Sequence, residues 1–153
     1  MEDLFVALPK VYQPDGDAGR EALLKKLEEI RQLAESGKRD TLALRCAWGR
    51  AKVLERNEPE RARAALLATA PLVDTKVHNP MITVDCADAQ REAGNLLLAK
   101  QLYTETRKWN PRAIQKDRIY AGLGQIAESE GDIDEAIKFY EKFENETAAS
   151  TRL

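Results

Sequence analysis

Residues 131–143 read GDIDEAIKFYEKF, and this segment carries the strongest structural signal in the chain. Gly131 is of the residue type that most often ends a helix in the left-handed conformation. Asp132 and Glu135 have the spacing of a capping box at the start of the next helix, with Asp in place of the usual Ser or Thr. Ala136 and an aromatic residue one turn later then share a helix face. The segment predicts a turn followed by a helix that packs closely on a neighbour.

The same arrangement recurs at intervals of 37 residues. In each copy an alanine is preceded by a turn-forming residue and followed, one helical turn later, by a bulky apolar residue. The three sets are Asn57–Ala62–Leu66, Gly94–Ala99–Tyr103 and Gly131–Ala136–Tyr140. A unit of this length accommodates two helices of about 14 residues with short connections. The pattern therefore predicts three helical hairpins, at about 40–76, 77–113 and 114–148.

The last unit resembles the tetratricopeptide repeat, whose pattern runs W-x2-L-G-x2-Y, then A-x3-F, then P. Its first helix reads Tyr120-x-x-Leu123-Gly124-x-x-Ala127, so Tyr replaces Trp and Ala replaces Tyr. The period also exceeds the 34 residues usual for the family. The resemblance nevertheless implies an all-α fold, an α-solenoid of stacked antiparallel helical hairpins that form a superhelix, as one domain overall.

Residues 1–39 precede the three hairpins. Within them, Asp17–Ser36 carries apolar residues at helical spacing, and Gly37 ends the run. We expect a helix here, which is either a cap on the first hairpin or the second helix of a partial fourth repeat.

Composition limits the possible partners. The 153 residues are 43% apolar and 33% charged, with a net charge of −2. Residues 40–76 hold seven basic and five acidic residues, whereas 114–153 hold five basic and nine acidic ones. Neither segment has the dense basic stripe that a phosphate backbone requires, so we expect no nucleic-acid partner. No apolar stretch is long enough to span a bilayer, and the sequence predicts a cytoplasmic protein that does not bind membranes.

No set of residues has the spacing of a catalytic or metal site. Cys46 and Cys86 lack a CxxC spacing, and only His78 could join them as a ligand. The two cysteines are therefore expected to be buried, reduced thiols. We expect no catalytic residue, no cofactor and no metal, and the chain is predicted not to be an enzyme.

The resemblance implies that the first helices of successive hairpins line a concave groove that receives a peptide or helix of a partner. Carried over by position, the groove residues are Trp48, Arg50, Asp85, Asp88, Arg91, Arg118, Gln125 and Glu128. Asp85 and Asp88 lie one helical turn apart and would attract a basic segment of the partner. The alternative is that these charges are simply solvated on an exposed helix face.

The predicted function is that of an interaction module, a scaffold or adaptor that holds another protein. The alternative is a non-catalytic regulatory or docking subunit of an enzyme complex. After Phe143 too few residues remain for a polar capping helix, which solenoids usually need. We therefore expect either a homodimer formed through the uncapped last hairpin, or a natural chain that continues further.

Overall fold

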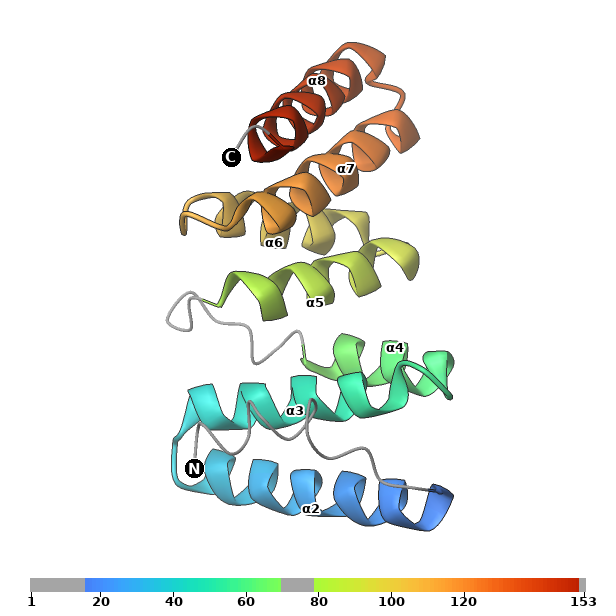
Figure 1. Ribbon diagram of the computed structural model, residues 1–153, viewed down its shortest axis with the longest axis vertical. Helices are drawn as coiled ribbons and strands as arrows, with labels where there is room; N and C mark the ends of the chain where they lie inside the picture. The colour runs from blue at the N-terminus through green and yellow to red at the C-terminus, as the bar shows by residue number, and fades with distance from the viewer. Residues whose placement is uncertain (1–15, 70–78, 152–153) are drawn as a thin grey trace. The chain divides into compact units, whose positions relative to one another are not determined.

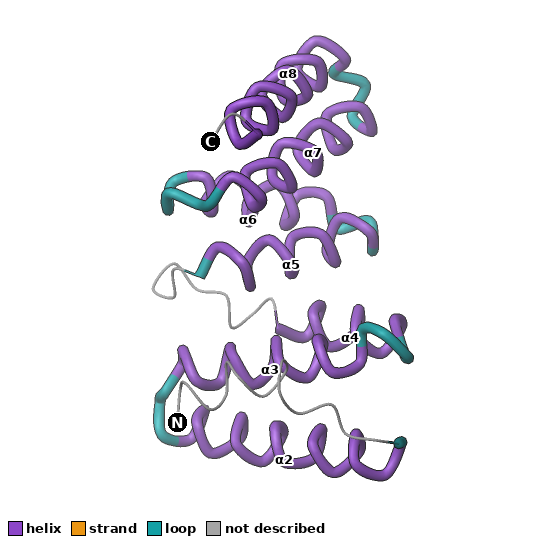
Figure 2. Tube along the Cα trace, viewed as in Figure 1, coloured by secondary structure: helices purple, strands orange, loops and turns teal. Residues whose placement is uncertain are grey.

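The computed structural model describes residues 16–69 and 79–151, and every regular element in these ranges is an α-helix (Figures 1 and 2). This confirms the all-α prediction. The helices are α2 (Asp17–Ser36), α3 (Asp40–Leu54), α4 (Pro59–Thr69), α5 (Pro80–Glu92), α6 (Leu96–Arg107), α7 (Ala113–Ser129) and α8 (Ile133–Thr151). Residues 1–15 of the N-terminal segment, and His78, lie outside the described residues.

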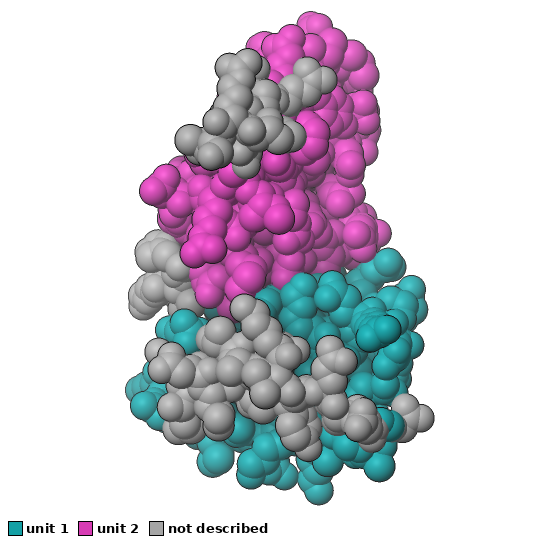
Figure 3. Space-filling model, in the orientation of Figure 1, with its two compact units in different colours: residues 1–77 teal, residues 78–153 magenta. Residues whose placement is uncertain are grey.

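The chain divides into two compact units, residues 1–77 and 78–153 (Figure 3). The first holds α2, α3 and α4, and the second holds α5 to α8. The division falls between the first and second hairpins that the repeat predicts. Each unit is therefore described by itself.

In the first unit, α3 packs against both α2 and α4. The α2 helix has the bounds predicted from its apolar spacing. Its buried residues face α3, because Leu27 packs with Cys46, and Leu24 packs with Leu54 and with Ala62 of α4. A stripe of apolar side chains at helical spacing thus places α2 directly on the first predicted hairpin.

The second unit contains two hairpins, α5–α6 and α7–α8, whose turns have the same geometry. Gly94 and Gly131 both adopt the left-handed conformation, with φ of 87° and 81°. The amide that follows each glycine donates to a carbonyl in the last turn of the helix, with N···O distances of 2.9 Å in both cases. This is the hydrogen bond of a Schellman motif. The predicted turn thus occurs twice, 37 residues apart.

The turn between α3 and α4 differs in geometry from the two glycine turns. Asn57 lies in this turn, as predicted, but it does not adopt a positive φ. The amide of Glu58 donates to the carbonyl of Leu54 at 2.8 Å. This turn therefore closes without a left-handed residue.

The repeated alanines are buried in all three hairpins, with 5%, 0% and 2% of Ala62, Ala99 and Ala136 exposed. In the second unit, the tyrosines that follow them lie against glycines of α7. A Cβ at Gly122 would come closer than 3.0 Å to the ring of Tyr103, and a Cβ at Gly124 would do the same to Tyr140. With the rings in these positions, a side chain at either glycine would require the ring to shift.

Side chains also fix where two helices begin. Asn79 accepts a hydrogen bond from the amide of Ile82 at 3.2 Å, and Pro80 is the first residue of α5. Asp132 accepts from the amide of Glu135 at 3.1 Å, as the capping-box spacing predicts. The residues after Phe143 extend α8 as far as Thr151 and do not start a separate helix within the described range.

Candidate functional site

Arg118 of α7 joins two carboxylates of α5, and this contact organises the predicted groove residues of the second unit. Its Nη2 atom lies 2.8 Å from Oδ1 of Asp85 and 2.5 Å from Oδ2 of Asp88. Its Nε donates to the same oxygen of Asp88 at 3.1 Å. Asp85 is buried and Asp88 is half-buried. Because α5 packs on α7, residues 30 positions apart form one ion-pair cluster.

Tyr103 of α6 also belongs to this cluster. Its ring is fully buried, and its hydroxyl donates to Oδ1 of Asp88. Burial, with the nearby charge of Asp88, raises the pKa of Tyr103 above its usual range. The hydroxyl therefore stays protonated and remains a donor at neutral pH. Both oxygens of Asp88 are thus occupied by donors from other helices.

The Arg118 side chain keeps its charge in this setting. Burial lowers its pKa, but the hydrogen bonds and charges of Asp88 and Asp85 outweigh that effect, and the pKa is raised overall. A guanidinium that is partly removed from water is stable only when carboxylates pair with it. The cluster is consequently a fixed structural contact between α5 and α7.

Arg91 extends the network along α5. Its Nη1 donates to Oε1 of Gln125 at 2.5 Å, and its Nε donates to the Tyr103 hydroxyl at 3.3 Å. Its distance to Asp88 is 4.0 Å, at the limit of an ion pair. Arg118 therefore makes closer contacts with the aspartates than Arg91 does.

These contacts bear on the expected role of the two acids. Arg118 contacts both Asp85 and Asp88, and the Tyr103 hydroxyl donates to Asp88, so both carboxylates have partners within the chain. The sequence showed the two acids one turn apart, but it could not show the arginine that α7 brings to them. Of the predicted residues in this unit, Gln125 and Glu128 have exposed side chains.

Trp48 and Arg50, the two predicted residues of the first unit, both lie half-buried on α3. Lys52 places its Nζ 5.7 Å from the centroid of the Trp48 ring. Nη1 of Arg50 donates to Oε2 of Glu28 on α2 at 2.7 Å. The structure thus brings Arg50 to an acid that the sequence reading had not singled out.

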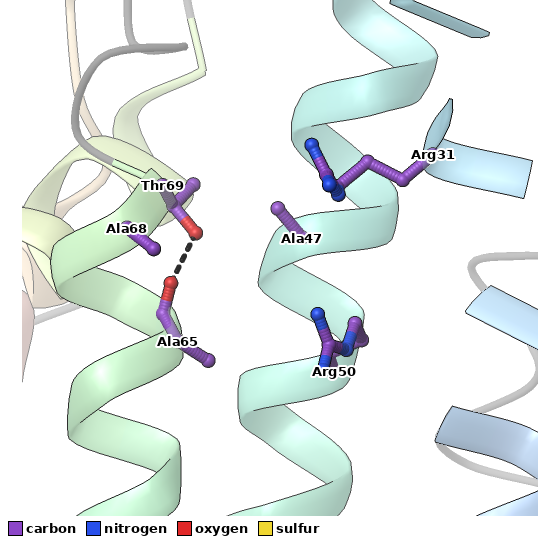
Figure 4. A pocket seen from close by; sticks show the side chains of 6 residues that line it. All are labelled: Arg31, Ala47, Arg50, Ala65, Ala68 and Thr69. Atoms are coloured by element: carbon purple, nitrogen blue, oxygen red, sulfur yellow. Dashed lines mark hydrogen bonds between the residues drawn. The ribbon is translucent and has the colours of Figure 1, made fainter. Parts of the chain in front are cut away.

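Arg50 borders a pocket of about 140 Å³ in the first unit (Figure 4). The guanidinium groups of Arg31 and Arg50 line one side, with Ala47 between them, and α4 forms the other side. The α4 residues are Ala65, Ala68 and Thr69. The hydroxyl of Thr69 is already used, because it donates to the carbonyl of Ala65 at 2.6 Å.

Glu28 bridges the two arginines beside this pocket. It accepts two hydrogen bonds from Arg31, at 2.9 and 2.5 Å, in addition to the one from Arg50. The hydrogen bonds from Arg31 and the charges of both arginines lower the pKa of Glu28 to about 2. Glu35 pairs with Arg31 as well, at 2.5 Å. Two acids therefore balance the two arginines, and the Glu28–Arg31 spacing of three residues was the signal in the sequence.

A second pocket lies in the other unit, where α6 connects to α7. Its volume is about 490 Å³. It is lined by Thr104, Arg107, Lys108, Asn110, Pro111, Lys116 and Tyr120. The sequence has no local signal for this basic pocket, because its residues come from two helices and the joint between them.

Cys46 and Cys86 are both free and buried, as predicted. Burial raises the pKa of Cys46 to about 11 and that of Cys86 to about 12. Thiols of this kind are poor nucleophiles at neutral pH. Within residues 16–69 and 79–151, no group of three or more His, Cys, Asp or Glu side chains is placed to hold a metal ion. In the same ranges no helix is both long and apolar enough to cross a bilayer.

Comparisons of the chain with protein-family models, curated proteins and solved structures found no match. The assignment of a function therefore rests on the residues and contacts described above.

Proposed function

We propose that this chain is a protein-interaction module similar to tetratricopeptide-repeat scaffolds and adaptors, and that its hairpins stack as a solenoid. In this proposal a peptide or helix of the partner lies along the surface that α5 and α7 present together. The observation that carries the proposal is the set of side-chain hydrogen bonds between these two helices, from Arg118 to Asp88 and from Arg91 to Gln125.

Such cross-helix bonds favour binding because they fix the surface before a partner arrives. Ordering loose side chains on association costs about 0.5–1.5 kcal/mol for each one. Asp88, Arg91 and Arg118 are already ordered by their own partners. A partner would then bind to the edge of a formed network through the exposed Gln125 and Glu128, with little ordering cost.

The internal pairing changes the partner that we propose. Arg118 pairs with both Asp85 and Asp88, and Arg91 lies 4.0 Å from Asp88, so two cations face the two acids. The surface therefore carries mixed polar groups and does not favour a basic segment. Polar recognition then depends on matched hydrogen bonds. We also place the module in the cytoplasm, a reducing compartment in which free thiols such as Cys46 and Cys86 persist.

Photo-cross-linking tests this proposal. A photoreactive amino acid replaces Gln125 of α7 in the full chain, and the matched control carries it at Gln32 of α2, which is also an exposed glutamine. We expect a discrete cross-linked protein in native cells from position 125 and none from position 32. Equal products at both positions, or none at position 125, would contradict the proposal. A cross-linked enzyme that keeps its activity in the complex would favour the docking-subunit alternative.

A further inference from the structure

The basic pocket at the joint of α6 and α7 differs from the surface of α5 and α7 in its charge. Three of its seven lining residues are cations, and none is acidic. Its volume of about 490 Å³ falls within the range of pockets that bind ligands, about 300–1,000 Å³. This contrasts with the first unit, where two glutamates balance the two arginines beside the smaller pocket.

Arg107, which lines the pocket, and Lys142 of α8 both lie over aromatic rings, and one of these rings is that of the lining residue Tyr120. The Cζ atom of Arg107 lies 5.5 Å from the centroid of Tyr120 and 5.9 Å from that of Phe139. The Nζ atom of Lys142 lies 5.9 and 5.8 Å from the same two centroids. These are cation–π distances, so both charges lie against the same two rings. Among the side chains that the structure describes, neither is paired with a carboxylate.

Ring contacts leave the hydrogen-bond donors of these groups available. A guanidinium over a ring uses its flat face, and its N–H groups lie in the plane and point outward. Arg107 can therefore donate two parallel hydrogen bonds to a carboxylate. Lys108 is paired with Glu105 at 2.9 Å, and Lys116 has a partner within the chain. These two lysines contribute positive charge, while Arg107 and Lys142 supply the available donors.

We propose that this basic pocket binds an acidic segment of a partner protein, with an Asp or Glu carboxylate of the segment held by Arg107 and a second one near Lys142. The inference deepens the proposed interaction function and rests on it only in taking the partner to be a protein. It assigns a second contact surface, made of residues other than those on α5 and α7.

Nucleic acid fits this pocket less well. Proteins that bind single strands stack bases on free aromatic faces, but Tyr120 and Phe139 already carry cations at cation–π distance. Residues 114–153 also hold nine acidic against five basic residues, so a long polyanion would be repelled outside the pocket. A short acidic peptide avoids that repulsion.

The test measures binding of fluorescent peptides to the full chain at low salt. The probe is hexaglutamate with blocked termini. Blocked hexaglutamine controls for the backbone, and hexaglutamine with a free C-terminus asks whether a terminal carboxylate is enough. An oligonucleotide of six phosphates represents nucleic acid. We expect hexaglutamate to bind best, with an affinity that falls as salt is added.

A pair of double variants locates the binding. In the first, Arg107→Gln and Lys142→Gln remove the two ring-held cations. In the control, Lys100→Gln and Lys138→Gln remove the same charge from exposed lysines that already pair with Glu130 and Glu135. We expect the first to lower the affinity for hexaglutamate about ten-fold and the control less than about two-fold. Circular dichroism checks that both variants fold.

Three results would overturn the inference: no binding of hexaglutamate, equal losses in both double variants, or tighter binding of the oligonucleotide. The cross-link from position 125 shows whether a negative result rejects this inference or the proposed function. If the cross-link forms but hexaglutamate does not bind, only the basic pocket is rejected. If hexaglutamate binds but no cross-link forms, only the surface of α5 and α7 is rejected.

Discussion

Tyr103 and Tyr140 occupy the same position in successive hairpins, 37 residues apart, and each lies against a glycine of α7. Tyr103 is fully buried, and its hydroxyl donates to Asp88. Tyr140 is half-buried, and its neighbouring acid is Glu128, whose side chain is exposed. For Tyr103, α7 belongs to the next hairpin and adds to the contacts within the α5–α6 hairpin, whereas for Tyr140, α7 is the other helix of its own hairpin. One repeated residue thus has two energetic roles.

The largest difference between the two tyrosine sites should appear in the free energy of unfolding when the glycine beside each ring is replaced by alanine. Gly122→Ala pushes a Cβ into the buried Tyr103 ring, which has no space to move. Overpacking of this kind costs about 1–3 kcal/mol, and the better helix propensity of alanine returns about 0.5–1 kcal/mol. Because the Cβ would overlap a fully buried ring, we take the upper end of that cost and expect a net loss of about 2 kcal/mol in urea unfolding.

Gly124→Ala is the matched variant. The half-buried Tyr140 ring can move aside, so its effect should lie within about 0.5 kcal/mol of zero. Ala121→Gly, in the same helix, measures the propensity change alone. The rate at which each buried thiol is labelled reports the stability of its own unit. Gly122→Ala should speed the labelling of Cys86 in the second unit more than that of Cys46 in the first. Equal losses for the two glycine variants would mean that both rings are equally confined.

We expect a smaller difference in the free energy of unfolding when the hydroxyl of each tyrosine is removed. Tyr103→Phe deletes a buried donor to Asp88, and we expect a loss of about 1 kcal/mol in the free energy of unfolding. Tyr140→Phe should cost less than about 0.5 kcal/mol, because water can replace a bond at a half-exposed site. Chemical denaturation of both variants measures this. A larger effect at Tyr140 would show that the last hairpin depends on Glu128 more than the structure indicates.

The smallest expected effect is the loss of stability at alkaline pH, where the two tyrosines ionise. The pKa of Tyr103 is raised by burial and by Asp88, and that of Tyr140 is raised by burial and by Glu128. A raised pKa in the folded state gives stability that is fully present below the unfolded value of about 10 and is lost as pH rises above it. Stability should therefore decline above that pH, and less so in the Tyr103→Phe variant.

Absorbance at alkaline pH follows this ionisation directly. The Tyr103 phenol should ionise only together with unfolding, whereas the Tyr140 phenol should ionise in the folded protein. Spectra of the two Phe variants assign the two steps. A wild-type protein in which Tyr103 ionises before circular dichroism changes would contradict the buried hydrogen bond to Asp88.

Much of the fold was predictable because its signals are local. The turns at Gly94 and Gly131 and the cap at Asp132 each depend on residues within a few positions, and all three occur as predicted. Asn57 also lies in a turn, but the α3–α4 turn closes without a positive φ, and the sequence does not distinguish the two kinds of turn. Local spacing predicts where a helix stops more reliably than how it stops.

The candidate site was less predictable because its contacts cross between helices. Asp85 and Asp88 were correctly grouped by their spacing on one helix. Their partner Arg118 lies 30 residues beyond Asp88 and reaches it only through the packing of α5 on α7. The basic pocket depends likewise on α6, α7 and the joint between them. Charges that look free in a sequence become paired, or stay available, according to packing.

The two glycines of α7 also bear on how the second unit folds. Each lowers the stability of an isolated helix by about 0.5–1 kcal/mol relative to alanine, so α7 gains its order mainly from the rings that pack on it. One of those rings comes from α6 and the other from α8. The central helix therefore forms only when both of its neighbours are in place, and residues 79–151 should fold in a single cooperative transition, with no stable intermediate in which one hairpin exists alone.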